Sequence, residues 1–101
     1  MGLVKVASTK DLEQGKMIGV EVGGKEVFIA NMGGKYYAIG NRCTHMGCML
    51  SDGTLRGENV TCPCHGSVFD VKTGNVVKGP AGKLEPAFQV KAEEDQILVS
   101  V

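Results

Sequence analysis

The chain has 101 residues, which is the size of one domain and leaves room for only a modest hydrophobic core. Its 15 glycines indicate many tight turns, and a hydrophobic content of 43% excludes an intrinsically disordered chain. Eleven Lys and Arg balance 11 Asp and Glu, so a net charge of zero argues against nucleic acid and anionic membranes as partners.

The N-terminal part of the chain, up to residue 41, predicts antiparallel strands. A short strand around residues 4–6 precedes one helical turn, which Ser8 caps with the help of Asp11 three residues further on. Alternating apolar residues and pairs of glycines then predict three strands joined by tight hairpins: residues 18–22, 26–31 and 35–39.

The C-terminal end predicts two more strands, residues 88–91 and 97–101, joined by an acidic, solvated turn at residues 93–95. We expect these strands and the N-terminal ones to form an all-β base, an antiparallel sandwich or barrel of residues 1–41 and 87–101. No apolar stretch is long enough to cross a bilayer and no secretory segment is present, so we expect a cytoplasmic protein.

The middle of the chain, residues 42–86, has a different composition. It holds every cysteine, both histidines and all three prolines. Short strands are expected around its apolar residues: Leu50, Leu55, Val60, Val68 and Val76–Val77. They are too few to form a core by themselves, so we expect a small inserted subdomain that a bound metal group stabilises, within a single domain of residues 1–101.

The segments Cys43–Cys48 (CTHMGC) and Cys62–Ser67 (CPCHGS) each place a thiol next to an imidazole. A c-type haem needs C-x-x-C-H and a thioredoxin-like site needs C-x-x-C, and neither spacing is present. A nucleophilic Cys–His pair leaves the second Cys–His pair unexplained. A structural zinc site of two Cys and two His stays open, although C-x-H is tighter than the usual zinc spacing.

The pattern C-x-H, sixteen residues, C-x-x-H resembles the Rieske family, in which two Cys bind one iron of a 2Fe-2S cluster and two His bind the other. The resemblance extends to Gly79-Pro80-Ala81, which is similar to the proline loop of that family. It implies the Rieske fold, with a cluster-binding subdomain inserted in a β base. It also implies four metal ligands: Cys43, His45, Cys62 and His65.

By the same resemblance, Cys48 and Cys64 occupy positions at which respiratory and photosynthetic Rieske subunits have a disulfide between the two loops. Many low-potential Rieske ferredoxins lack this disulfide, and two free thiols are the alternative here. Ser67 matches the serine whose hydroxyl points at a bridging sulfide, whereas Phe69 stands where high-potential members have a tyrosine. The resemblance therefore implies an intermediate reduction potential, within the broad Rieske range of about −150 to +300 mV.

Further residues are expected close to the cluster. Gly47 and Gly66 would allow the backbone to approach it and present N–H groups to sulfur. Met46, with Met49, would form an apolar cover, although ordinary packing explains such a methionine equally well. Pro80 would shield the far side of the cluster, and a plain turn proline is the alternative.

The resemblance implies a monomeric one-electron carrier with no catalytic residues of its own. Its expected donor is a flavin or ferredoxin reductase, and its expected acceptor is an oxygenase or another redox enzyme. Two related roles stay open: the small Rieske subunit of an enzyme such as nitrite reductase, or a subunit of a quinol-oxidising complex. A zinc-stabilised interaction domain is the alternative outside the family.

Overall fold

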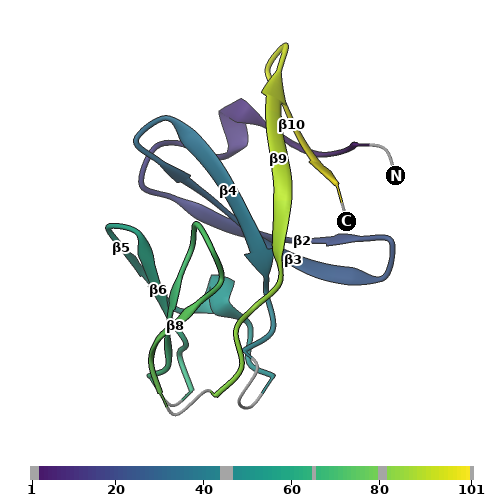
Figure 1. Ribbon diagram of the computed structural model, residues 1–101. Helices are drawn as coiled ribbons and strands as arrows, with labels where there is room; N and C mark the ends of the chain where they lie inside the picture. The colour runs from purple at the N-terminus through teal and green to yellow at the C-terminus, as the bar shows by residue number, and fades with distance from the viewer. Residues whose placement is uncertain (1–2, 44–46, 65, 80–81, 101) are drawn as a thin grey trace.

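The computed structural model describes residues 3–43, 47–64, 66–79 and 82–100 and shows two antiparallel sheets (Figure 1). The expected all-β class is confirmed. The strands are β1 (Val4–Ser8), β2 (Met17–Val22), β3 (Lys25–Met32), β4 (Lys35–Gly40), β5 (Thr54–Arg56), β6 (Asn59–Thr61), β7 (Val68–Asp70), β8 (Val76–Lys78), β9 (Ala87–Glu93) and β10 (Gln96–Ser100). Two short 3-10 helices complete the described elements, η1 (Thr9–Asp11) and η2 (Leu50–Asp52).

The larger sheet has six strands in the order β1-β10-β9-β4-β3-β2. Its two edge strands, β1 and β2, also contact each other, so the sheet curls into a near-barrel. The predicted capping box at η1 is present, because the Ser8 side chain accepts from the helix and Asp11 accepts from the Ser8 N–H. In the part of the chain that is described, neither helix has the length or the apolar character to cross a membrane.

The smaller sheet, β5-β6-β7-β8, consists of three-residue strands. Strands were predicted around five apolar sites in this region, and four of the predictions hold. The prediction at Leu50 was wrong, because Leu50 begins η2 instead. Its backbone N–H donates to the Asn41 carbonyl at 2.7 Å, and its side chain is fully buried. A helical turn thus directs this leucine into the core.

Strand β3 connects the two hydrophobic cores. Val27 and Ile29 face the inside of the near-barrel, while Phe28 and Ala30 on the opposite face pack against the smaller sheet. All four side chains are fully buried. The smaller sheet completes its core with side chains from the larger one, which explains how strands of only three residues can be stable.

Candidate metal centre

The segment Cys43–Cys48 forms a closed loop directly after β4. The Cys43 N–H donates to the Cys48 carbonyl at 2.7 Å, and the Gly47 N–H donates to the Cys43 carbonyl at 2.8 Å. Gly47 has φ of 76°, in the left-handed region that favours glycine. The loop therefore reverses within six residues and returns Cys48 next to Cys43.

The segment Cys62–Ser67, which follows β6, repeats this geometry. The Cys62 N–H donates to the Ser67 carbonyl at 2.7 Å, and the Gly66 N–H donates to the Cys62 carbonyl at 3.2 Å. Gly66 has φ of 77°, almost the value of its counterpart in the first loop. Each loop thus begins with a cysteine and turns at a glycine four residues later, so the two loops present their first cysteines in the same way.

A disulfide between Cys48 and Cys64 joins the two loops, with the Cα atoms 6.4 Å apart. The pairing that the family resemblance implied is therefore present. Cys43 and Cys62 lie outside the disulfide, with only 3% and 2% of their surface exposed. The four cysteines thus divide into one pair that joins the loops and one pair that can bind a ligand.

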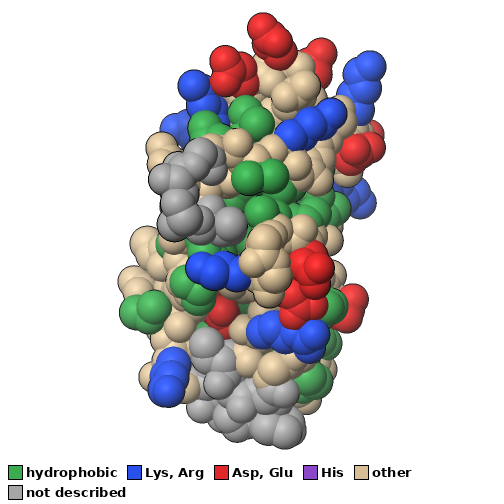
Figure 2. All heavy atoms as spheres, turned by 90° about the vertical axis from the view of Figure 1, so that its right-hand side faces the viewer, with side chains coloured by type: hydrophobic (Ala, Val, Ile, Leu, Met, Phe, Trp, Pro, Cys, Tyr) green, Lys and Arg blue, Asp and Glu red, His purple; other side chains and the backbone are tan. Residues whose placement is uncertain are grey.

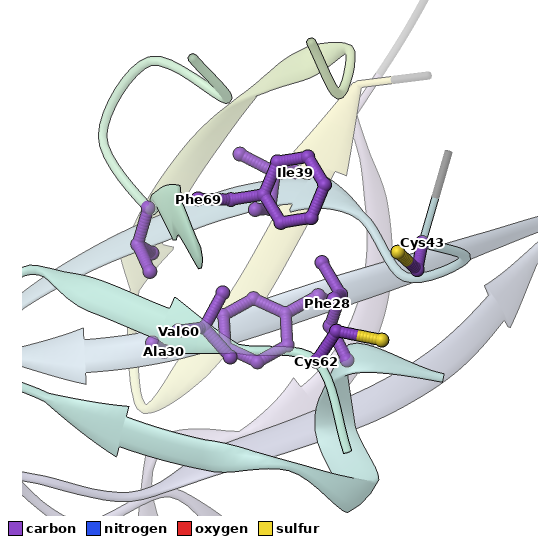
Figure 3. Packing of buried hydrophobic residues seen from close by; sticks show 9 residues of the cluster. Phe28, Ala30, Ile39, Cys43, Val60, Cys62 and Phe69 are labelled. Atoms are coloured by element: carbon purple, nitrogen blue, oxygen red, sulfur yellow. The ribbon is translucent and has the colours of Figure 1, made fainter. Parts of the chain in front are cut away.

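Cys43 and Cys62 belong to the same buried apolar group as Phe28 and Phe69. Figure 3 shows the sulfur atoms of Cys43 and Cys62 on the same side of this group. Buried thiols that serve as metal ligands are thiolates, whose charge the metal compensates. Two thiolates together with the two imidazoles of the loop sequences form a donor set that suits zinc or an iron-sulfur cluster.

Four of the predicted site residues lie outside the described residues: the two proposed ligands His45 and His65, and the two shielding residues Met46 and Pro80. Ser67 and Phe69 are described, and both are fully buried. Ser67 closes the second loop through its carbonyl, and Phe69 lies on β7 with its ring against Ile39 (Figure 3). Both residues therefore lie within or directly after the second loop.

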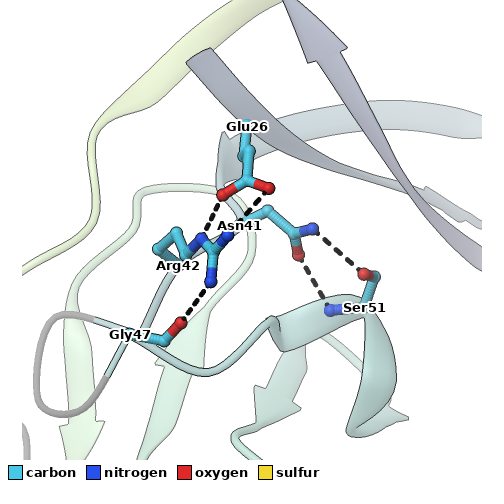
Figure 4. Close-up of polar contacts among 5 residues, drawn as sticks. All are labelled: Glu26, Asn41, Arg42, Gly47 and Ser51. Atoms are coloured by element: carbon cyan, nitrogen blue, oxygen red, sulfur yellow. Dashed lines mark hydrogen bonds and ion pairs between the residues drawn. The ribbon is translucent and has the colours of Figure 1, made fainter. Parts of the chain in front are cut away.

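A polar network that the sequence did not reveal holds the first loop from outside (Figure 4). The Asn41 amide donates to the Ser51 hydroxyl at 3.0 Å and accepts from the Ser51 N–H at 2.8 Å. Arg42 donates to the Gly47 carbonyl at 2.9 Å and to both carboxylate oxygens of Glu26. The one sequence signal for this network was that Arg42 directly precedes the candidate ligand Cys43. Its partner Glu26 is sixteen residues away in the sequence, so the contact itself could not be predicted.

A cleft of about 450 Å³ lies between the β3–β4 and β5–β6 hairpins. At its edge, Lys72 forms an ion pair with Glu58 at 2.9 Å and lies 5.8 Å from the centre of the Tyr37 ring. The hydrogen bond and the charge of Glu58 raise the pKa of Lys72 above its ordinary value. No described residue of either cysteine loop lines this cleft, so it is separate from the candidate metal centre.

Comparisons with known proteins agree with this geometry. The Rieske [2Fe-2S] domain family matches residues 2–92. The ferredoxin component of the naphthalene 1,2-dioxygenase/salicylate 5-hydroxylase systems of Ralstonia sp. is 35% identical over 98 residues, 97% of this chain and 94% of that protein.

Solved structures give the same result. The ferredoxin of carbazole 1,9a-dioxygenase from Nocardioides aromaticivorans IC177 has a TM-score of 0.94 and 32% identity, over 99% of this chain and 98% of that chain. A chain in the complex of reduced oxygenase and oxidized ferredoxin in carbazole 1,9a-dioxygenase has a TM-score of 0.91 and 32% identity, over 97% and 92% of the two chains. The similarity thus includes both sheets and both cysteine loops.

Proposed function

The chain belongs to the Rieske [2Fe-2S] domain family, and from this membership we propose that it serves as the ferredoxin component of an oxygenase system. It carries a Rieske 2Fe-2S cluster, which takes up and releases one electron at a time when bound. The protein is an electron carrier rather than an enzyme in its own right.

The observation that carries the proposed assignment of ligands is the pair of buried cysteines outside the disulfide, one at the start of each of two matching loops. Under this proposal Cys43 and Cys62 hold one iron, and His45 and His65 hold the other. The disulfide supports the assignment because it occupies the other two cysteines. Neutral imidazoles in place of two thiolates leave the oxidised centre uncharged rather than dianionic, so an electron is easier to add.

We place the docking surface for redox partners at the end of the molecule that carries the cysteine loops. The acidic β9–β10 turn lies at the opposite end, where Figure 2 shows its carboxylates gathered. Two exposed apolar side chains, Val77 and Leu84, lie on either side of Gly79-Pro80-Ala81 in the sequence. Exposed apolar side chains suit a transient protein interface.

The proposal also covers the redox partners, the oligomeric state and the cellular location. A reductase supplies the electron, an oxygenase receives it, and the protein acts as a monomer in the cytoplasm. A ferredoxin similar to this chain occurs in a complex with the oxygenase of the carbazole system, which supports an acceptor of that class.

A reductive titration tests the function. We expect the purified protein to take up one electron per chain reversibly, with iron and sulfide present in equal amounts and a Rieske-type EPR spectrum in the reduced state. The reduced protein should then pass its electron to the oxygenase of the carbazole system when it replaces that system's own ferredoxin. Bound zinc without a reducible centre would contradict the proposal.

Ser67 and Phe69 provide a test of how the potential is set. We expect Ser67→Ala to lower the midpoint potential and Phe69→Tyr to raise it, each by roughly 20–60 mV. One hydrogen bond to sulfur contributes about 0.5–1.5 kcal/mol, and a tenfold change in the equilibrium constant of a one-electron reduction corresponds to about 59 mV. Both side chains are buried in or beside the second loop, so no solvent competes for the bond. Protein-film voltammetry on both variants measures the shifts, and shifts of the opposite sign would refute this role.

A further inference from the structure

We propose that Arg42 is a positioning residue for the cluster. In this view it orients the Gly47–Cys48 peptide so that the Cys48 N–H is held as a hydrogen-bond donor to a cluster sulfur. The inference rests on the proposed function, because it requires the first cysteine loop to hold the cluster. It concerns a residue outside the proposed ligands and outside the disulfide.

The contacts of Arg42 connect the first loop to the larger sheet. Its guanidinium uses two N–H groups on the carboxylate of Glu26 in β3 and a third on the Gly47 carbonyl (Figure 4). The Glu26 side chain is only 22% exposed, and its backbone carbonyl also accepts the Asn41 N–H at 3.0 Å. A bidentate Arg–carboxylate pair of this kind has a defined geometry, unlike most surface ion pairs. The loop is therefore fixed relative to a strand of the base.

Peptide geometry carries this restraint to the other side of the loop. A trans peptide is planar, so the Gly47 carbonyl and the Cys48 N–H point in opposite directions. With the carbonyl held by Arg42, the N–H is directed away from the guanidinium. The Cys48 carbonyl accepts from Cys43, but no described residue accepts a hydrogen bond from the Cys48 N–H. This N–H is thus a donor that is held in place and available to sulfur.

The chemistry of such a donor predicts the direction of the effect. An N–H that points at sulfur stabilises the additional negative charge of the reduced state, which raises the midpoint potential. The charge of Arg42 itself contributes less, because Glu26 neutralises it at close range. Loss of the planar guanidinium group and its hydrogen bonds, rather than loss of its charge, should therefore change the midpoint potential.

The test compares Arg42→Met and Arg42→Lys with a matched control, Arg56→Met. Arg56 is an exposed arginine on β5, and no described residue forms a hydrogen bond or ion pair with its side chain. We expect both Arg42 variants to have a lower midpoint potential and to lose iron at least about tenfold faster under a chelator, the usual range for outer-sphere partners of metal ligands. We expect the control to match the unmodified protein in both measurements.

Proton ENDOR on the reduced protein supplies a direct readout. An exchangeable proton coupling assigned to the Cys48 N–H should weaken in both Arg42 variants. It should also weaken in Glu26→Gln, which keeps Arg42 but replaces the carboxylate that accepts hydrogen bonds from its guanidinium. A lysine variant with an unchanged potential, or couplings that stay the same in all variants, would overturn the inference. Failure of the proposed function is distinguishable, because the unmodified protein would then show no Rieske signal at all.

Discussion

Replacing Cys43 or Cys62 by alanine is expected to abolish the 2Fe-2S cluster. Each of these buried thiols supplies one of the proposed ligands, and an iron with three ligands instead of four is lost readily. Because metal binding is coupled to folding, these variants should also unfold at lower denaturant concentration. Iron and sulfide content, visible absorption and the reduced-state EPR signal measure the loss.

The matched control is the double variant Cys48→Ser, Cys64→Ser, which removes two cysteines from the same loops. It should retain its iron, with a less stable cluster, because only the connection between the loops is lost. Closing a loop of this size contributes about 3 kcal/mol in isolation, and less where the cluster already ties the loops.

This comparison also separates two ligand sets. The sulfur atoms of Cys48, Cys62 and Cys64 lie within 4.8 Å of one another, so proximity alone would favour these three as a metal site. The disulfide instead withdraws two of them from metal binding. Loss of iron in the double variant, together with retention in the Cys43→Ala variant, would show that the proposed set is wrong.

Gly74→Ala should destabilise the fold by about 2–5 kcal/mol. Gly74 has φ of 81°, which costs roughly 1–2 kcal/mol for a residue with a side chain. Its added Cβ would also overlap the carbonyl oxygen of Glu85, and overpacking of this kind costs about 1–3 kcal/mol more. The Glu85 N–H donates to the Gly74 carbonyl at 2.7 Å, so the clash lies where the chain returns toward β9.

Gly57→Ala provides the control for this effect. Gly57 has φ of 57° in the β5–β6 turn, but nothing lies within 4 Å of an added Cβ. Gly57→Ala should therefore lower the free energy of unfolding only by the conformational cost of the left-handed backbone, about 1–2 kcal/mol. Urea denaturation of both variants gives the comparison. Equal losses of stability would mean that the contact with Glu85 yields to a small backbone shift.

Much of the larger sheet could be predicted from local sequence signals. Alternation between Ile18 and Val22 and the glycine pairs that follow indicate hairpins, because both strand periodicity and tight turns depend on neighbouring residues. The capping box of Ser8 and Asp11 was predictable for the same reason. The error at Leu50 arose because one buried apolar residue without a periodic neighbourhood does not distinguish a strand from a helical turn.

The candidate site could be predicted as a set of residue types but not as an arrangement. The spacing of the Cys and His residues indicated the family, and the resemblance implied the disulfide that the structure contains. The ligand set itself stays a prediction, as does the division into a base and a cluster-binding subdomain. No sequence signal connects Glu26 with Arg42, because their contact depends on where β3 lies relative to the first loop.

The sequence by itself determined the chemistry available to this protein: two thiols and two imidazoles at Rieske spacing, glycines at the turns of both loops, and strands with clear alternation. These features are local, so neighbouring residues specify them. Only the tertiary structure decided how β3 divides its two faces between two cores and how Arg42 holds the first loop. Such features join segments far apart in the chain, and they exist only after the two sheets have packed together.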